Sequence, residues 1–396
     1  MSTVKIIKAI YSINTPMFLG SACIKEAELR PPSVIGILRF WFRALALGEL
    51  GGDKRGVFEY ESILFGTAGT GDESGGRKAL YSLKIKKNNL CPKKELNFRN
   101  KHGLTYLAYG LNKYNKKEKI FFPTRNFLPQ NNNIEIILIE NRSIKANLDS
   151  EKVKKAHELL IKTLKLMGFI GGLGSRTRRG FGSLTLIKLE EDGKMITTSG
   201  VGKTALEYKK ELKELLSKSL SFNKNYSEIE YTAISQNTKI HITNQKTDPL
   251  DVINEIGEEM IRYRSYGRNG KILNKEGSRK IFKDDHDLIY NFVKGTNINE
   301  HPRRVVFGLP HNYRLGGGQN ININSKNRRA SPLFIHIHKL KNSKYIGVLV
   351  LIPCKFLKNG DKITLRGRNR KGRSFSEKAS YKIIEDFLNE SYDNKI

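Results

Sequence analysis

The densest group of residues able to bind an anion lies in residues 171–182, GGLGSRTRRGFG, which hold five glycines and three arginines. Glycine permits a positive φ and lacks the Cβ that would keep a ligand at a distance. Arginine carries a planar fork of donors that fits phosphate oxygens. These residues therefore predict a loop that wraps closely around a polyanion backbone, although a flexible surface loop with incidental charge is the alternative.

Two further arginines, Arg39 and Arg43, stand four residues apart in residues 34–47, which are otherwise almost entirely apolar. We predict a buried helix there, capped by Ser33, with both arginines on one face. The functional interpretation is that their guanidinium groups meet backbone phosphates while Trp41 or Phe42 packs or stacks nearby. The alternative is that both arginines snorkel from a core helix and pair with carboxylates.

A third basic segment, residues 262–270 (RYRSYGRNG), interleaves three arginines with two tyrosines. Phosphate attraction and base stacking can act together in such a segment, so it favours single-stranded nucleic acid. A basic helix C-terminus that complements the helix dipole explains the same residues equally well.

The whole chain is strongly basic: its 396 residues include 71 Lys and Arg against 39 Asp and Glu, a formal net charge of +32. A folded chain with this charge predicts a polyanionic partner, most often nucleic acid. An anionic membrane is the competing partner, but the sequence shows no apolar stretch of the roughly 18 residues that a spanning helix needs. The N-terminus also lacks the apolar stretch of a signal peptide, so we expect a cytoplasmic protein without a membrane partner.

Residues that could carry catalysis or hold a metal form no convincing group. Residues 200–204 (GVGKT) precede a helical pattern, but Thr197 stands where a phosphate-binding P-loop begins with glycine. The acidic run 284–287 is more typical of a helix start than of a metal site. His336 and His338 alternate along a predicted strand without a third ligand, and the three cysteines are too far apart in sequence to suggest a disulfide framework or zinc site. We therefore predict no catalytic residue, no metal and no cofactor.

The segments that must position these residues alternate between strand and helix patterns. Over the first 190 residues we predict a strand, a helix, two strands, a second helix, the glycine loop and a last strand. This succession suits a βαββαβ ferredoxin-like unit with insertions. The largest insertion, residues 86–133, is poor in apolar residues. Its only strongly apolar segment contains Phe121 and Phe122, and we predict that this segment anchors the insertion to the rest of the protein. The predicted ranges are 3–13, 34–47, 80–87, 134–140, 148–169 and 181–189.

The second half again mixes helices and strands, and the polar, glycine-containing residues 190–202 mark the boundary. We therefore predict domains 1–195 and 196–396. The predicted fold class is α+β, with two ferredoxin-like (RRM-like) domains, although no repeat is visible residue by residue. Helices are predicted over 203–220, 248–263 and 374–388, the last with a capping box of Ser374 and Glu377, and strands over 229–242, 305–310, 331–338 and 346–352.

Several of these segments resemble the RAMP superfamily of CRISPR proteins and, within it, the family of subunit 1 of the Cmr (type III-B) effector complex. The most specific motifs are RFWFR in residues 39–43 and GSRTRRGFG in residues 174–182. Other matching segments are residues 14–20, 28–38, 64–66, 304–310 and 328–333.

The resemblance implies a subunit that assembles with sibling RAMP subunits around a guide RNA, near the guide 3′ end, and helps to capture single-stranded target RNA. It attributes target cleavage to a different subunit, which agrees with the lack of a catalytic group in this sequence. The residues that the resemblance and the basic motifs place against RNA are Arg30, Arg39, Trp41, Arg43, Gly174, Ser175, Arg176, Arg178, Arg179, Arg328 and Arg329.

Two other functions are compatible with the sequence. A RAMP-type endoribonuclease that processes guide RNA needs a general acid and base beside the phosphate, for which His157, His102 and Tyr11 are poor candidates. A ribosome-associated RNA-binding protein would explain the charge but not the paired motifs.

Overall fold

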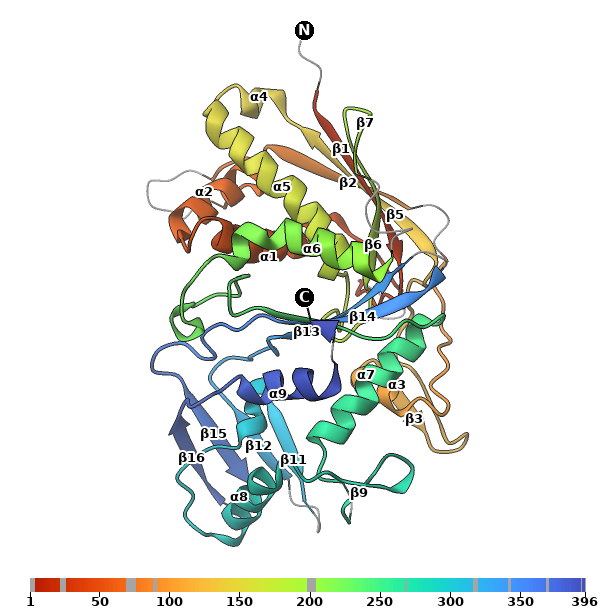
Figure 1. Ribbon diagram of the computed structural model, residues 1–396, viewed down its shortest axis with the longest axis vertical. Helices are drawn as coiled ribbons and strands as arrows, with labels where there is room; N and C mark the ends of the chain where they lie inside the picture. Colours follow the sequence, from red (N-terminus) through yellow and green to blue (C-terminus); the bar gives the residue numbers. More distant parts are fainter. Residues whose placement is uncertain are drawn as a thin grey trace.

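Two buried clusters of apolar side chains organise the chain in the computed structural model (Figure 1). The first cluster joins the strands and helices of the N-terminal half to some residues beyond 204. The second combines the C-terminal half with side chains from residues 98–127, so each half contributes to the core of the other. The structure describes residues 4–21, 26–68, 76–87, 91–197, 204–267, 269–315, 320–340, 343–367, 370–392 and 394–395.

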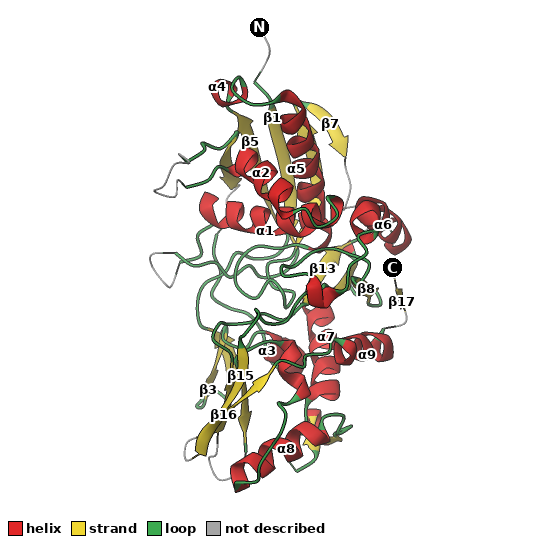
Figure 2. Cartoon of the chain, turned by 90° about the vertical axis from the view of Figure 1, so that its left-hand side faces the viewer, coloured by secondary structure: helices red, strands yellow, loops and turns green. Residues whose placement is uncertain are grey.

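A five-stranded antiparallel sheet with helices packed on one face forms most of the N-terminal half (Figures 1 and 2). Its elements are β1 Ile6–Ile13, α1 Pro31–Glu49, α2 Lys54–Phe65, β2 Tyr81–Lys87, β5 Asn132–Glu140, α5 Ser150–Ile170, β6 Leu184–Glu191 and β7 Lys194–Thr197. The strand order is β2-β5-β1-β6-β7. β5 alternates between half-buried and buried positions, the pattern of a strand with one covered face. The strands and long helices predicted for this half are confirmed.

The start of α1 differs from the prediction. The helix begins at Pro31, after Arg30 with its extended backbone, and Ser33 lies inside the first turn. Proline suits this position because its missing N–H would have no partner in the first turn of a helix. Ser33 is therefore not the cap, and its own N–H donates to the Arg30 carbonyl at 3.1 Å.

The C-terminal half contains a second antiparallel sheet, β13-β14-β8-β17, against which α7 and α9 pack. A third sheet, β11-β12-β15-β16, is built from segments that precede β13 and follow β14. The elements are α6 Ala205–Leu220, β8 Lys239–Ile242, α7 Pro249–Arg264, β9 Lys271–Ile272, β10 Glu276–Gly277, α8 Lys283–Lys294, β11 His311–Arg314, β12 Asn320–Asn324, β13 Leu333–Lys339, β14 Tyr345–Leu351, β15 Lys362–Gly367, β16 Arg370–Ser376, α9 Lys382–Ser391 and β17 Asn394–Lys395. Short elements between β2 and α5 are α3 His102–Leu107, β3 Asn112–Asn115, β4 Ile120–Pro123 and α4 Arg142–Lys145.

One strand predicted in the second half is too long, and another is wrong. Residues 229–242 form a strand only over β8, because Ser235 and Thr238 hydrogen-bond to each other in a turn that interrupts the apolar pattern. The apolar residues at 305–310 belong mainly to a 3₁₀ helix, Arg303–Phe307, whose last four side chains are buried. A short apolar run that is buried all round does not distinguish strand from helix.

The helix predicted over residues 374–388 exists, but the predicted start is eight residues before the observed one. Ser374 belongs to β16 and pairs with Thr364 across the sheet, with the two hydroxyl oxygens 2.9 Å apart. It therefore caps no helix, and the predicted capping box is absent. The helix itself, α9, begins at Lys382.

The insertion of residues 86–133 is anchored differently from the prediction. Its helix α3 packs backbone to backbone on α7, so closely that a Cβ on Gly257 would lie 2.2 Å from the Gly103 carbonyl oxygen. The predicted anchor residues Phe121 and Phe122 are instead 37% and 39% exposed, in the β3–β4 hairpin. The insertion is therefore held by α3, and it ties the N-terminal half to the second cluster.

This contact gives a stability prediction. Gly257→Ala should force α3 away from α7 and lower the free energy of unfolding by about 1–3 kcal/mol, the usual cost of overpacking. Thermal denaturation followed by circular dichroism measures the change. Gly36→Ala in α1 is the matched control, because a Cβ there meets nothing within 4 Å, and it should leave stability unchanged or slightly higher. Equal melting curves for both variants would contradict the backbone contact.

Candidate nucleic-acid interface

The glycine loop, residues 171–182, connects α5 to β6 and packs against the segment that follows β1. Gly174 has a φ of +93°, and a Cβ there would lie 2.5 Å from the Phe18 carbonyl oxygen. The same carbonyl accepts the Ser175 N–H at 2.7 Å. We predicted that these glycines let a polyanion come close to the loop. Gly174 instead lets the backbone at Phe18 pack directly against the loop, and this packing holds the neighbouring arginines in fixed positions.

Arg178, in the middle of this loop, joins the two halves of the chain. Its Nη1 donates to the Ser331 carbonyl at 2.6 Å, and its guanidinium lies 4.3 Å from the ring centre of Phe334 and 5.3 Å from that of Phe40. Its own carbonyl accepts the Ile335 N–H. Burial, with the neighbouring Arg329 guanidinium, lowers the pKa of Arg178 to about 10, so it stays charged at neutral pH. Arg178 is therefore not part of the candidate interface, because protein groups already surround its guanidinium.

Arg39 and Arg43 share one carboxylate, that of Glu61 in α2. Arg43 donates to both Glu61 oxygens at 2.6 Å, and the Glu61 side chain is only 7% exposed. Arg39 lies 3.4 Å from the same carboxylate and donates to the carbonyls of Phe65 and Gly66 at 2.7 and 2.5 Å. Hydrogen bonding to Glu61 raises the pKa of Arg43. These contacts favour the alternative in which both arginines pair within the protein.

Three other predicted residues lie in separate surroundings, and one of them, Arg329, lines a cavity together with Arg328. Trp41 is 3% exposed and packs against Phe334 at 5.3 Å between ring centres, so it has no face for a base. Arg329 donates to the carbonyl of Lys355 at 3.0 Å. Arg30 is exposed at the start of α1. The stacking role predicted for Trp41 is corrected by its burial in the core.

The contacts of Arg39 and Arg43 can be tested by a double-mutant cycle. Arg39→Met keeps the apolar stem but removes the donors to two carbonyls and a buried carboxylate, so the free energy of unfolding should fall by about 1–3 kcal/mol. Combining it with Glu61→Gln should cost less than the sum of the single changes, because each single change already removes the contact between Arg39 and the Glu61 carboxylate. Urea denaturation measures the coupling. Unchanged stability together with weaker RNA binding would instead favour the phosphate-contact interpretation.

Four arginines meet where the two halves join, and we call Arg328, Arg176, Arg179 and Arg264 the arginine row. Within the part of the chain that the structure describes, none of them has an ion pair with a carboxylate. Burial lowers the pKa of Arg176, Arg179 and Arg264. Neighbouring guanidinium groups lower these pKa values further, with Arg328 acting on Arg176, Arg176 on Arg179, and Arg179 on Arg264. Such a group of like charges is favourable only beside a partner that neutralises it.

The insertion places two tyrosines beside the arginine row. The hydroxyl of Tyr106 accepts a hydrogen bond from Arg264 Nη1 at 2.7 Å. Tyr109 is 64% exposed, and a Cβ on the next residue, Gly110, would lie 2.9 Å from the Arg176 guanidinium. The sequence prediction missed both tyrosines, because their position depends on the packing of α3 against α7 and no local motif marks them.

The basic segment 262–270 contributes one residue to the arginine row. Arg264 belongs to the row, whereas Arg262 forms ion pairs with Glu259 and Glu276 at 2.6 and 3.1 Å. Arg268 lies outside the described residues. The nucleic-acid interpretation of this segment therefore depends on Arg264. The ion pairs of Arg262 indicate a structural role for that residue at the end of α7.

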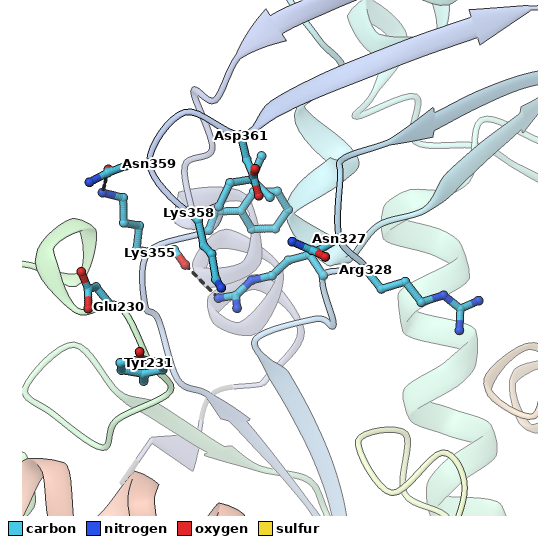
Figure 3. A pocket seen from close by; sticks show the side chains of 11 residues that line it. Glu230, Tyr231, Asn327, Arg328, Lys355, Lys358, Asn359 and Asp361 are labelled. Atoms are coloured by element: carbon cyan, nitrogen blue, oxygen red, sulfur yellow. Dashed lines mark hydrogen bonds between the residues drawn. The ribbon is translucent and has the colours of Figure 1, made fainter. Parts of the chain in front are cut away.

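Two cavities flank the arginine row. The larger, about 1200 Å³, is lined by Arg264 and Tyr106, and the smaller, about 700 Å³, by Arg328 together with Tyr231 and Lys355. In Figure 3 the side chain of Arg328 points away from Lys355 and from Tyr231. Because Arg264 lines one cavity and Arg328 the other, the row connects them across the junction of the two halves.

The residues considered for acid–base chemistry are engaged elsewhere or buried. Tyr11 is fully buried and donates to the Leu164 carbonyl at 2.8 Å. His157 lies 3.3 Å from a carboxylate oxygen of Glu191, and burial, aided by the charge of Lys5, lowers its pKa. His102 is the first residue of α3. The described residues contain no group of three histidines, cysteines or acids arranged to hold a metal ion.

Comparison with known proteins confirms the resemblance to the RAMP superfamily, whose sequence profile matches residues 11–185. None of the helices in the described ranges has the length and apolar composition needed to cross a bilayer. The matched region contains α1, α5 and the whole glycine loop.

More narrowly, the chain is similar to CRISPR system Cmr subunits of Pyrococcus furiosus. It is 28% identical to subunit Cmr1-1 over 188 residues, which are 46% of this chain and 48% of that protein. It is 27% identical to subunit Cmr1-2 over 196 residues, which are 46% of this chain and 97% of that protein. The match thus spans about half the length of Cmr1-1.

Solved structures share the fold over nearly the whole chain. The crystal structure of Cmr1 from Pyrococcus furiosus in its apo form superimposes with a TM-score of 0.54 and 19% identity, covering 98% of both chains. A cryo-EM structure of the type III-B Cmr-beta complex bound to cognate target RNA contains a chain with a TM-score of 0.51 and 12% identity, covering 98% and 99%. At these identities the likeness establishes a mixed α/β fold with antiparallel sheets, similar to that of Cmr1.

Proposed function

We propose that this chain is a non-catalytic RNA-binding subunit of a type III-B CRISPR (Cmr) effector complex. In that role it helps to hold guide RNA and single-stranded target RNA near the guide 3′ end, beside sibling RAMP subunits. The similarity to Cmr1 subunits, and to a chain of a Cmr complex bound to target RNA, supports the assignment. The observation that carries the RNA-binding part is the arginine row, which has no ion-paired carboxylate among the described residues.

The arginine row is suited to a phosphate backbone. Two of its members come from the glycine loop and two from the C-terminal half, so one strand laid across the junction would contact both halves. Arginine binds phosphate oxygens through two donors at once, and the exposed ring of Tyr109 is available to a base. Contacts of this kind hold a strand in place with little sequence preference.

We also infer that each half is a ferredoxin-like unit. In the first half four strands follow one another in the sequence as β1, β2, β5 and β6, and in the sheet they lie side by side as β2-β5-β1-β6. Helix α1 lies between β1 and β2 in the sequence, and α5 lies between β5 and β6. In the second half the strands follow one another in the sequence as β8, β13, β14 and β17, and they lie in the sheet as β13-β14-β8-β17, which is the same arrangement. Helix α7 follows the first of these strands, as α1 does, and α9 precedes the last, as α5 does. This common order supports domains divided near residue 195, although α6 packs its buried side chains in the first cluster.

Incubation of the purified chain with end-labelled single-stranded RNA tests this function. The expected result is a shifted and uncut RNA whose binding weakens steeply with salt. Metal-independent cutting by the purified chain would contradict the non-catalytic role and favour a guide-processing endoribonuclease. Absence of binding at low salt would contradict the RNA-binding role itself.

A further inference from the structure

The larger cavity, at the Arg264 end of the arginine row, has the size of a site for a small ligand. Its volume is about 1200 Å³, and its walls come from α3, the C-terminus of α7, α8, the 3₁₀ helix before β11, and β11 itself. Ligand sites in proteins typically occupy about 300–1000 Å³. The cavity can therefore enclose a group as large as a nucleotide.

The walls of this cavity are basic. Arg264, Lys280, Arg304 and Arg314 line it, and none of the described lining residues is acidic. The charge of Arg304 is neutralised by the buried carboxylate of Asp285, which lies 3.5 Å from the Arg304 Nε. The other three cations have no such partner in the described ranges, and the buried Nε of Arg264 makes no hydrogen bond. The cavity therefore presents unbalanced positive charge.

One wall is a flat aromatic surface. The rings of Tyr266 and His286 are 4.0 Å apart and within 6° of parallel, and both line the cavity. His286 is held in turn by Asp287, whose carboxylate lies 3.1 Å from Nδ1. A supported aromatic ring beside cationic groups is the combination that binds a nucleobase together with its phosphate.

His311, which also lines the cavity, is a hydrogen-bonding partner for ribose. Burial and the charges of Arg264 and Arg304 lower its pKa to about 3, so the imidazole is neutral at physiological pH. A neutral imidazole has one nitrogen that accepts hydrogen bonds. In a wall otherwise rich in donors, this acceptor suits a ribose hydroxyl, the group that distinguishes RNA from DNA.

We propose that this cavity binds one ribonucleotide, with its phosphate against Arg264 and Arg314 and its base against Tyr266. The ribonucleotide is either part of an RNA strand or a free nucleotide. The first source rests on the proposed function, since Arg264 also belongs to the arginine row and a strand on the row would reach the cavity. The second source is independent of it.

Isothermal titration of the full chain with AMP tests the site. AMP should bind, and adenosine, which lacks the phosphate, should bind at least about 10-fold more weakly. Tyr266→Ala and Arg314→Gln should each weaken AMP binding about 10-fold. Arg366→Gln removes the same charge from an exposed position in the same sheet but outside the cavity, and it should leave AMP affinity unchanged. Arg314 is exposed on β11, so its variant tests the site even if changes at the more buried Arg264 impair folding.

Competition then distinguishes the two sources. Displacement of AMP by a short single-stranded RNA indicates a nucleotide of the strand, and retention of AMP alongside bound RNA indicates a free nucleotide. No AMP binding, or equal AMP binding by wild type and Tyr266→Ala, overturns the inference even if the chain shifts RNA normally. AMP binding without any RNA binding sustains the cavity site and refutes the proposed function instead.

Discussion

Replacing Arg176, Arg179 and Arg328 together by Gln should weaken the binding of single-stranded RNA about 100-fold and flatten its salt dependence. A contribution of about 1 kcal/mol for each charge-assisted contact gives a loss of this size. For single strands, log K falls with log salt by about 0.7 per neutralised phosphate, so the slope should decrease by about 2. Fluorescence anisotropy of a labelled RNA across a series of KCl concentrations measures both quantities.

The control for this variant removes the same charge elsewhere. Arg55, Arg142 and Arg366 are exposed arginines outside the arginine row, and their combined replacement by Gln should lower affinity only slightly through the smaller net charge. Circular dichroism should show both triple variants folded. An equal loss of affinity in the control would mean that RNA responds to overall charge, and the arginine row would lose its special role.

Gly182→Ala should disrupt the glycine loop and lower the free energy of unfolding by more than about 4 kcal/mol. Gly182 has a φ of +63°, where a side chain costs about 1–2 kcal/mol. The larger cost is steric, because the added Cβ would lie 1.9 Å from the carbonyl oxygen of Leu173. The Leu173 N–H donates to the Gly182 carbonyl at 2.9 Å, so neither strand of the loop can withdraw without losing a buried hydrogen bond. Urea denaturation of the purified variant measures the change.

Gly193→Ala separates the two costs at Gly182. Gly193 also has a positive φ, +78°, but a Cβ there meets nothing within 4 Å. Its variant should therefore lose only about 1–2 kcal/mol. If Gly182→Ala were no worse than Gly193→Ala, the close packing of the loop against its own backbone would be refuted.

The N-terminal elements were predictable because each is long and periodic. β1, β5 and α5 carry repeating apolar positions that specify both the type of element and the buried face. The anchoring of the insertion was not predictable, since it depends on Gly103 and Gly257 meeting across two helices far apart in sequence. The early start assigned to α9 came from a capping pattern whose serine pairs in a sheet instead.

The candidate site was predictable in part. The density of arginine and glycine in residues 171–182 located the right loop, but sequence could not separate Arg178, buried against Phe334, from its neighbour Arg179 in the arginine row. The partner of Arg39 and Arg43 is also a tertiary feature, because Glu61 lies on another helix. Spacing along one helix shows which side chains share a face, and it does not show what that face meets.

Ultraviolet cross-linking of bound single-stranded RNA, with mass spectrometry of the attached peptides, locates the RNA on the surface of this chain. Cross-links should appear on peptides that contain Tyr106, Tyr109 and residues 174–181, and the recovered RNA should be intact. Cross-links confined to α1 around Arg39 and Arg43, with none at the arginine row, would contradict the proposed interface.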